Sequence, residues 1–107
     1  MTESEFAALA DASIATIERS IEASGIDADT RMKGDGVLEV EFENCSKIVI
    51  NRHAAAREIW VAAPSGGFHF RHDGADWRDS RDGSELFAAL SKLVTAQSGE
   101  AVILSRR

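Results

Sequence analysis

The residues with the clearest capacity for chemistry are carboxylates near the N-terminus. Residues 1–43 contain eleven acids against three bases, whereas residues 44–107 contain seven acids against nine bases. At about 100° of turn per residue, several of these acids fall within roughly 100° of arc on one predicted helix. They are Glu3, Asp11, Glu18 and Glu22, and Asp27, Asp29 and Asp35 continue the charge just past the helix. Carboxylate oxygens suit hard cations, and without preformed geometry we expect the affinity to be modest.

A solvated helix face is the ordinary explanation for such a run of charge. Two features weigh against it, because the interleaving lysines are missing and the excess of acid is confined to one end of the chain. Glu18 and Glu22 also form a like-charge pair four residues apart, which costs an isolated helix about 0.2–0.5 kcal/mol. An acidic N-terminal half repels phosphate backbones, so we expect no nucleic-acid partner. It favours cations or a basic protein surface.

Other reactive side chains form no catalytic constellation, so we expect the chain not to be an enzyme. His69 and His72 are three residues apart in a predicted strand and therefore face opposite sides, so they cannot chelate one ion together. His53 is isolated in a predicted loop. Cys45 lies in a predicted turn and has no identifiable base and orienting group. Gly34-Asp35-Gly36 precedes a strand, whereas a phosphate-binding glycine loop opens a helix, so we interpret it as a hairpin turn.

Two amphipathic helices are predicted. The first opens with a capping box formed by Thr2 and Glu5 and stops at Gly25. Its apolar stripe comprises Phe6, Leu9, Ala10, Ile14, Ile17 and Ile21. The second has N-cap candidates in Asp82-Gly83-Ser84, buries a stripe of Leu86, Phe87, Leu90, Leu93 and Val94, and ends at Gly99. The tail Ala101–Leu104 is expected to pack between the helices.

Short runs of alternating polarity between the helices predict strands. We expect them at Thr30–Lys33, Val37–Phe42, Ser46–Arg52, Arg57–Ala63 and Phe68–Asp73, with a last short strand around Trp77. Single-faced strands between two amphipathic helices favour one solution, with both helices on the same face. The prediction is one α+β domain over residues 1–107, a two-layer sandwich whose antiparallel sheet has about five to six strands.

One large aromatic points away from the predicted core. In Arg57–Ala63 the buried phase is Ile59 and Val61, which puts Trp60 on the open face of the sheet. Large aromatics on open surfaces are enriched where another protein docks. The alternative, that a loop or its own sheet neighbours cover the ring, stays open.

Composition predicts the cellular setting. The single cysteine, Cys45, excludes an intrachain disulfide and an all-cysteine metal site, so we expect a reducing cytoplasm. The N-terminus has the features of neither a signal peptide nor a transit peptide. No apolar run approaches about 18 residues, so no membrane span is predicted.

Three central segments, FENCSKIVINR, EIWVA and the turn PSGGFHF, closely resemble the frataxin family in its bacterial form. The resemblance extends from SEFAALADASIATIE near the start to GSELFAALSKLVTAQSGEAV near the end, so it spans essentially the whole chain. The order and spacing of the segments make it specific. Frataxins have an α–β–α arrangement, which agrees with the fold predicted from periodicity.

The resemblance implies an iron-binding regulator of iron–sulfur cluster assembly. Iron, as Fe²⁺ or Fe³⁺, would bind weakly along Glu3, Asp11, Glu18, Glu22, Asp27 and Asp29. Glu18 and Glu22 would also dock on the cysteine desulfurase, and Val49, Asn51, Arg52 and Trp60 on the open sheet face would touch the desulfurase or the iron–sulfur scaffold protein. The expected state is a monomer, with oligomers under iron load.

The chain departs from the family pattern at Arg19 and Ala23, where further acids are common, and this lowers the number of available ligands. Two alternatives remain. One is a ferroxidase or iron-storage protein, which would need a fixed di-iron pair that these spaced acids do not offer. The other is an acidic adaptor that binds no metal.

Overall fold

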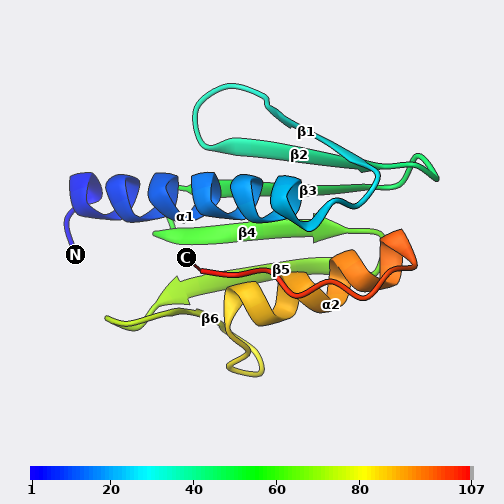
Figure 1. Ribbon diagram of the computed structural model, residues 1–107. Coiled ribbons are helices and arrows are strands. Elements are labelled where there is room, and N and C mark those ends of the chain that lie inside the picture. The colour runs from blue at the N-terminus through cyan, green and yellow to red at the C-terminus, as the bar shows by residue number, and fades with distance from the viewer. Residues whose placement is uncertain (107) are drawn as a thin grey trace.

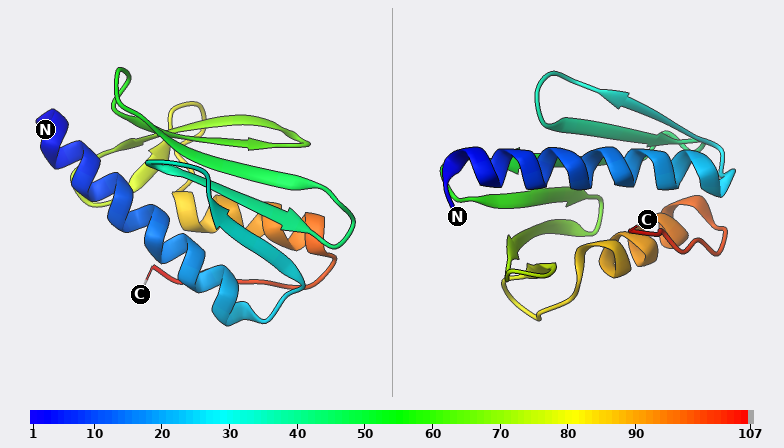
Figure 2. Two further views of the ribbon diagram at one scale, coloured as in Figure 1. Left: turned by 90° about the horizontal axis from the view of Figure 1, so that it is seen from above. Right: turned by 60° about the vertical axis from the view of Figure 1, so that its left-hand side comes forward.

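The computed structural model describes residues 1–106 and contains two helices and six strands within that range. In chain order the elements are α1 (Glu3–Ser24), β1 (Ala28–Met32), β2 (Val37–Phe42), β3 (Lys47–His53), β4 (Glu58–Ala63), β5 (Gly66–His72), β6 (Trp77–Asp79) and α2 (Leu86–Ser98). The strands form one antiparallel sheet in the order β1-β2-β3-β4-β5-β6. Both helices cover the same face of this sheet, and its other face is open (Figures 1 and 2). The predicted two-layer α+β sandwich is confirmed.

The core lies between the helices and the sheet and follows the predicted alternation. Every second residue of the central strands is buried against the helices, namely Leu38, Val40, Phe42, Ile48, Ile50, Ile59, Val61 and Phe70. The register keeps these residues on one face, because Leu38 pairs with Ile50 and Ile50 with Val61. Strand boundaries differ from the predicted ones by no more than two residues at most ends, and Val37–Phe42 is unchanged.

Helix α1 begins with the predicted capping box. Thr2 Oγ1 accepts from the Glu5 amide, and the Glu5 carboxylate accepts from the Thr2 amide. The hydrogen bond from the Thr2 backbone lowers the pKa of Glu5. Gly25 ends the helix with φ 76°, a left-handed conformation that glycine adopts without steric cost. One member of the predicted stripe is wrong, because Leu9 is 39% exposed while the other five residues are buried.

Helix α2 starts later than the sequence suggested. Its N-cap is Glu85, whose carboxylate accepts from the amides of Phe87 and Ala88. The predicted cap at Asp82-Gly83-Ser84 is therefore wrong, because Asp82 instead accepts from the Ser84 amide and closes the turn before the helix. The stripe prediction is confirmed for Leu86, Phe87, Leu90 and Val94, and Leu93 is partly buried against the same core.

The C-terminal tail lies along α2 and reaches α1, as predicted. Val102 and Leu104 are buried, and their backbones bond to Thr95 and Ser91 of α2. The Ser105 amide donates to Ser20 Oγ on α1, so the tail links the two helices (Figure 1).

Candidate functional site

The acidic face of α1 is the first candidate surface. Glu3, Asp11 and Glu22 are exposed and Glu18 is partly exposed, and we call these four residues the acidic ridge. No group of three or more His, Cys, Asp or Glu side chains within residues 1–106 is arranged to hold a metal ion. The acidic ridge therefore offers separate carboxylates to solvent and does not form a closed coordination site.

One acid of the ridge has a protein partner. Arg52 donates from Nη1 to Asp11 Oδ2, which links the end of β3 to α1. Arg52 shares its phase with Ile48 and Ile50 and pairs with Ile59, so its side chain lies on the helix side of the sheet. A Cβ at Gly36 would stand only 2.5 Å from the Arg52 side chain, which explains the glycine there. The prediction that Arg52 lies on the open sheet face is wrong, because the alternation of the strand turns it inward.

A hollow of about 540 Å³ lies between α1 and the turn joining β1 to β2. Asp11, Glu18 and Asp35 line it together with Arg52. The fold thus brings Asp35, which is eleven residues beyond the last residue of α1, back beside the middle of the acidic ridge.

The two remaining predicted ligands lie apart from the ridge. Asp27 is exposed in the loop after α1 and lines a hollow with Glu43 and Glu100. Asp29 is exposed in β1 and pairs in register with Glu41, whose side chain is on the open face of the sheet. Asp29 therefore faces away from α1, and the carboxylates do not form one continuous row.

The open face of the sheet holds the second candidate surface. Trp60 lies on this face and is half-buried, as its phase predicted. The cover comes from two histidines on neighbouring strands. His53 stacks on one side with ring centroids 3.8 Å apart and planes at 12°, and His69 stacks at 4.4 Å and 11°. The outward orientation is confirmed, and the alternative that sheet neighbours cover the ring describes what the structure shows, while docking through this residue stays a prediction.

A nearly buried carboxylate binds the N–H edge of the indole. Glu58 is 8% exposed, and its Oε1 accepts from Trp60 Nε1 at 2.9 Å. Its Oε2 accepts from Arg71 at 3.2 Å, and Oε1 lies 3.9 Å from Nδ1 of His69. A buried charge needs such partners, because an unpaired carboxylate would be strongly destabilising in this position. We call His53, Trp60, His69 and Glu58 the indole clamp.

The sequence contained a signal for the indole clamp that strand-by-strand reasoning missed. The two-residue connection Pro64-Ser65 fixes the β4–β5 register and places His69 directly opposite Trp60. Trp60 also pairs with Asn51, so His53 is its diagonal neighbour two residues along β3. His53 belongs to a strand and not to a loop, which corrects that prediction.

Several other predicted positions are confirmed. Val49 pairs with Ala62 and Asn51 with Trp60, so both lie on the open face near the indole. His69 and His72 do face opposite sides, because His72 packs edge-on against the buried Trp77. Cys45 is exposed in the β2–β3 turn with φ 70°, a conformation that favours glycine.

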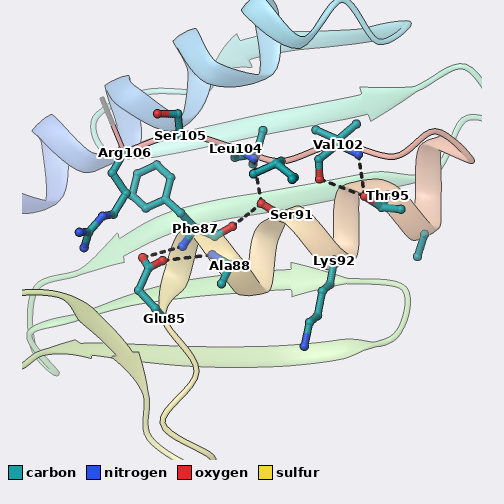
Figure 3. Close-up of a pocket in the computed structure, with 12 residues that line it drawn as sticks. Glu85, Phe87, Ala88, Ser91, Lys92, Thr95, Val102, Leu104, Ser105 and Arg106 are labelled. Atoms are coloured by element: carbon teal, nitrogen blue, oxygen red, sulfur yellow. Dashed lines mark hydrogen bonds between the residues drawn. The ribbon is translucent and has the colours of Figure 1, made fainter.

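A third hollow, of about 860 Å³, lies between α2 and the C-terminal tail (Figure 3). Phe87, Ala88, Val102 and Leu104 contribute much of its wall. Its polar groups are largely committed, since Glu85 caps the helix and Ser91 and Thr95 bond the tail. This hollow is the space left where the tail packs along α2, and its lining residues include no cluster of acids or histidines.

Neither helix among the described residues has the length and apolar character needed to cross a bilayer. The family model described as a frataxin-like domain matches residues 1–100. Among curated proteins, the chain is 54% identical over 104 residues to an iron-sulfur cluster assembly protein CyaY from Dechloromonas aromatica, covering 97% of this chain and 99% of that protein. It is 50% identical over 107 residues to the protein of the same description from Cupriavidus necator, covering 97% and 96%.

Solved structures agree with the sequence comparison. The frataxin from Psychromonas ingrahamii superposes with a TM-score of 0.91 at 37% identity, covering 98% of this chain and 99% of that one. A trimeric frataxin from Saccharomyces cerevisiae, complexed with ferrous iron, gives a TM-score of 0.63 at 27% identity, covering 81% and 79%. The chain therefore belongs to the frataxin-like family.

Proposed function

We propose that this protein is an iron-binding regulator of iron–sulfur cluster assembly, acting on the complex of cysteine desulfurase and scaffold protein without being an enzyme itself. The observation that carries the proposal is the acidic ridge, a solvent-facing side of α1 with four carboxylates, of which only Asp11 pairs with a basic side chain within residues 1–106. The description of the close relatives as iron-sulfur cluster assembly proteins supports the pathway.

The acidic ridge suits docking through long-range attraction. Its carboxylates are exposed or partly exposed, and complementary charge steers association and mainly raises the on-rate. The partner surface would be basic. Val49, Asn51 and Trp60 would supply a second, short-range contact on the open sheet face.

The residues fit iron as a weakly held cargo and do not fit a resident iron centre. Oxygen ligands suit hard cations, but the carboxylates of residues 1–106 do not converge in threes. Iron would therefore keep most of its water ligands and exchange readily. The same geometry disfavours the ferroxidase and storage alternatives, since a di-iron site needs carboxylates, usually with histidine, projecting into one centre.

The decisive experiment is a desulfurase and cluster-assembly assay with and without this protein, across iron concentrations. Glu18→Lys with Glu22→Lys should abolish association with the desulfurase, mostly through a slower on-rate. The control is Glu43→Lys with Glu100→Lys, which changes net charge equally at exposed acids outside the ridge. Equal loss of association in both variants would show that association depends on the net charge of the protein and not on the position of the acids on α1.

Iron binding is tested separately by backbone NMR during an Fe²⁺ titration. We expect residues 3–29 to broaden first, and binding to weaken with added salt. Broadening centred on His69 or His72 would overturn the assignment to the acidic ridge. Desulfurase association without any iron-induced broadening would support the metal-free acidic adaptor.

A further inference from the structure

The indole clamp differs from an ordinary exposed aromatic, because three strands fix one side chain. His53 comes from β3, Trp60 and Glu58 from β4, and His69 from β5. Both ring faces are covered at stacking distance, and the only indole donor is used by Glu58. Trp60 therefore presents the C–H edge of its ring, as the middle of a strip of three nearly parallel rings.

The flanking histidines are themselves held in place. Nδ1 of His53 accepts from the Ala56 amide at 3.2 Å, so the β3–β4 turn sets the orientation of its ring. His69 lies beside Glu58, which Arg71 also contacts. Each support of Trp60 thus has its own second contact, and the indole has little rotational freedom.

We propose that His53 and His69 are positioning residues, which hold Trp60 in advance in the orientation that the assembly partner binds. This inference rests on the proposed docking role of the open sheet face. An aromatic anchor that is ordered before binding loses less side-chain entropy on association. The partner would contact a flat strip of ring edges and could not hydrogen-bond the indole, whose donor is occupied by Glu58.

The experiment measures Trp60 order and partner binding in the same variants. The chain has two tryptophans, so the indole N–H signals in a ¹⁵N spectrum number two and Trp60→Phe assigns them. His53→Ala and His69→Ala should each lower the order parameter of the Trp60 indole N–H below its value in the unsubstituted protein. Each should weaken binding to the desulfurase–scaffold complex by about 3–10-fold, and the double variant should approach Trp60→Ala.

Rescue and a matched control separate positioning from general stability. His69→Phe keeps a flat ring on the indole, so it should restore both order and binding. His53→Phe keeps the ring but loses the acceptor for the Ala56 amide, so it should restore them only in part. His72→Ala removes a histidine from the same strand as His69 that packs on Trp77 instead, and it should leave Trp60 order and binding unchanged.

The possible failures have distinct meanings. If Trp60→Ala binds like the wild type, the docking role of the open face is wrong and this inference falls with it. If Trp60→Ala weakens binding but the histidine variants do not, only the positioning role is overturned. Unchanged indole order in both alanine variants, or a His69→Phe variant that fails to restore binding, would also overturn it.

Discussion

The acidic ridge and the indole clamp place functional side chains in opposite ways. On α1 the carboxylates stand apart in water, and in the part of the chain that the structure describes their one ion-pair partner is Arg52, which binds Asp11. On the open sheet face Trp60 contacts two rings and a carboxylate, and that carboxylate has further contacts of its own. The ridge should therefore act through summed charge and respond to salt. The clamp should act through contact, and its members should depend on one another.

The largest effect expected from this comparison concerns the two tryptophans. Trp77 is 4% exposed, packs edge-on against Phe6 and donates to Ser13, so Trp77→Ala should cost about 3–5 kcal/mol of unfolding free energy. Trp60→Ala leaves no core cavity and loses two ring contacts and the hydrogen bond to Glu58, which keeps its contact with Arg71, so we expect about 1–2 kcal/mol. Urea denaturation of both variants checks this.

Equal losses from the two tryptophan substitutions would make the indole clamp part of the core and not a surface feature. Trp60→Ala should also leave Fe²⁺ binding intact, because the strand alternation places the indole on the sheet face opposite the helices. A weakened iron titration in that variant would show that the two surfaces are coupled.

A Glu→Gln change should have opposite signs in the two regions. Glu58→Gln removes a nearly buried charge that faces Arg71 and His69, so it should destabilise the fold by about 1–2 kcal/mol. Glu22→Gln relieves repulsion with Glu18 and removes an acid from the last turn of α1, where no basic residue offsets the helix dipole. It should stabilise the fold by about 0.3–1 kcal/mol.

Thermal and urea unfolding of these two glutamine variants give the sign directly. Destabilisation by Glu22→Gln would mean that the ridge carboxylate has a favourable partner within the fold. A neutral Glu58→Gln would mean that the indole clamp survives without the charge, held by stacking alone.

Periodicity predicted the fold because burial repeats at fixed spacing. Alternation in β2 and β3 identified Leu38, Val40, Ile48 and Ile50 as core, and each is fully buried. The cap of α2 was missed because short polar residues are the preferred N-caps, whereas here the longer carboxylate of Glu85 reaches two amides. The preference for a short polar N-cap is a weak guide where the same side chain can instead stabilise a neighbouring turn. Asp82 is such a case, because it accepts from the Ser84 amide.

The candidate site was harder to predict, because its contacts run between elements. Arg52 was assigned to the open face although its phase matches Ile50, and only the fold shows its contact with Asp11. Spacing along one strand relates His69 only to His72, while the ring that His69 stacks on, Trp60, lies on the neighbouring strand, and His53 reaches the same ring from a third strand. A run of charged residues can be recognised directly in the sequence. The stack of His53, Trp60 and His69 can be predicted only once the register of three paired strands is known.

The smallest expected effect is the response of stability to ions, and it separates the two regions most cleanly. Moderate salt should screen repulsion along the acidic ridge and add about 0.5 kcal/mol, or roughly 2–4 °C in Tm. A divalent cation bound only by the folded state should add further stability by mass action. Glu18→Gln with Glu22→Gln should remove most of both gains. Glu58→Gln should retain them, because this carboxylate is nearly buried and does not belong to the acidic ridge. Differential scanning calorimetry across salt and Mn²⁺ concentrations measures these shifts. A wild-type Tm that changes with neither salt nor Mn²⁺ would show that the charge clustering on α1 does not affect stability. If Glu58→Gln loses the gain in Tm, the ion-sensitive charge lies on the sheet and not on the helix.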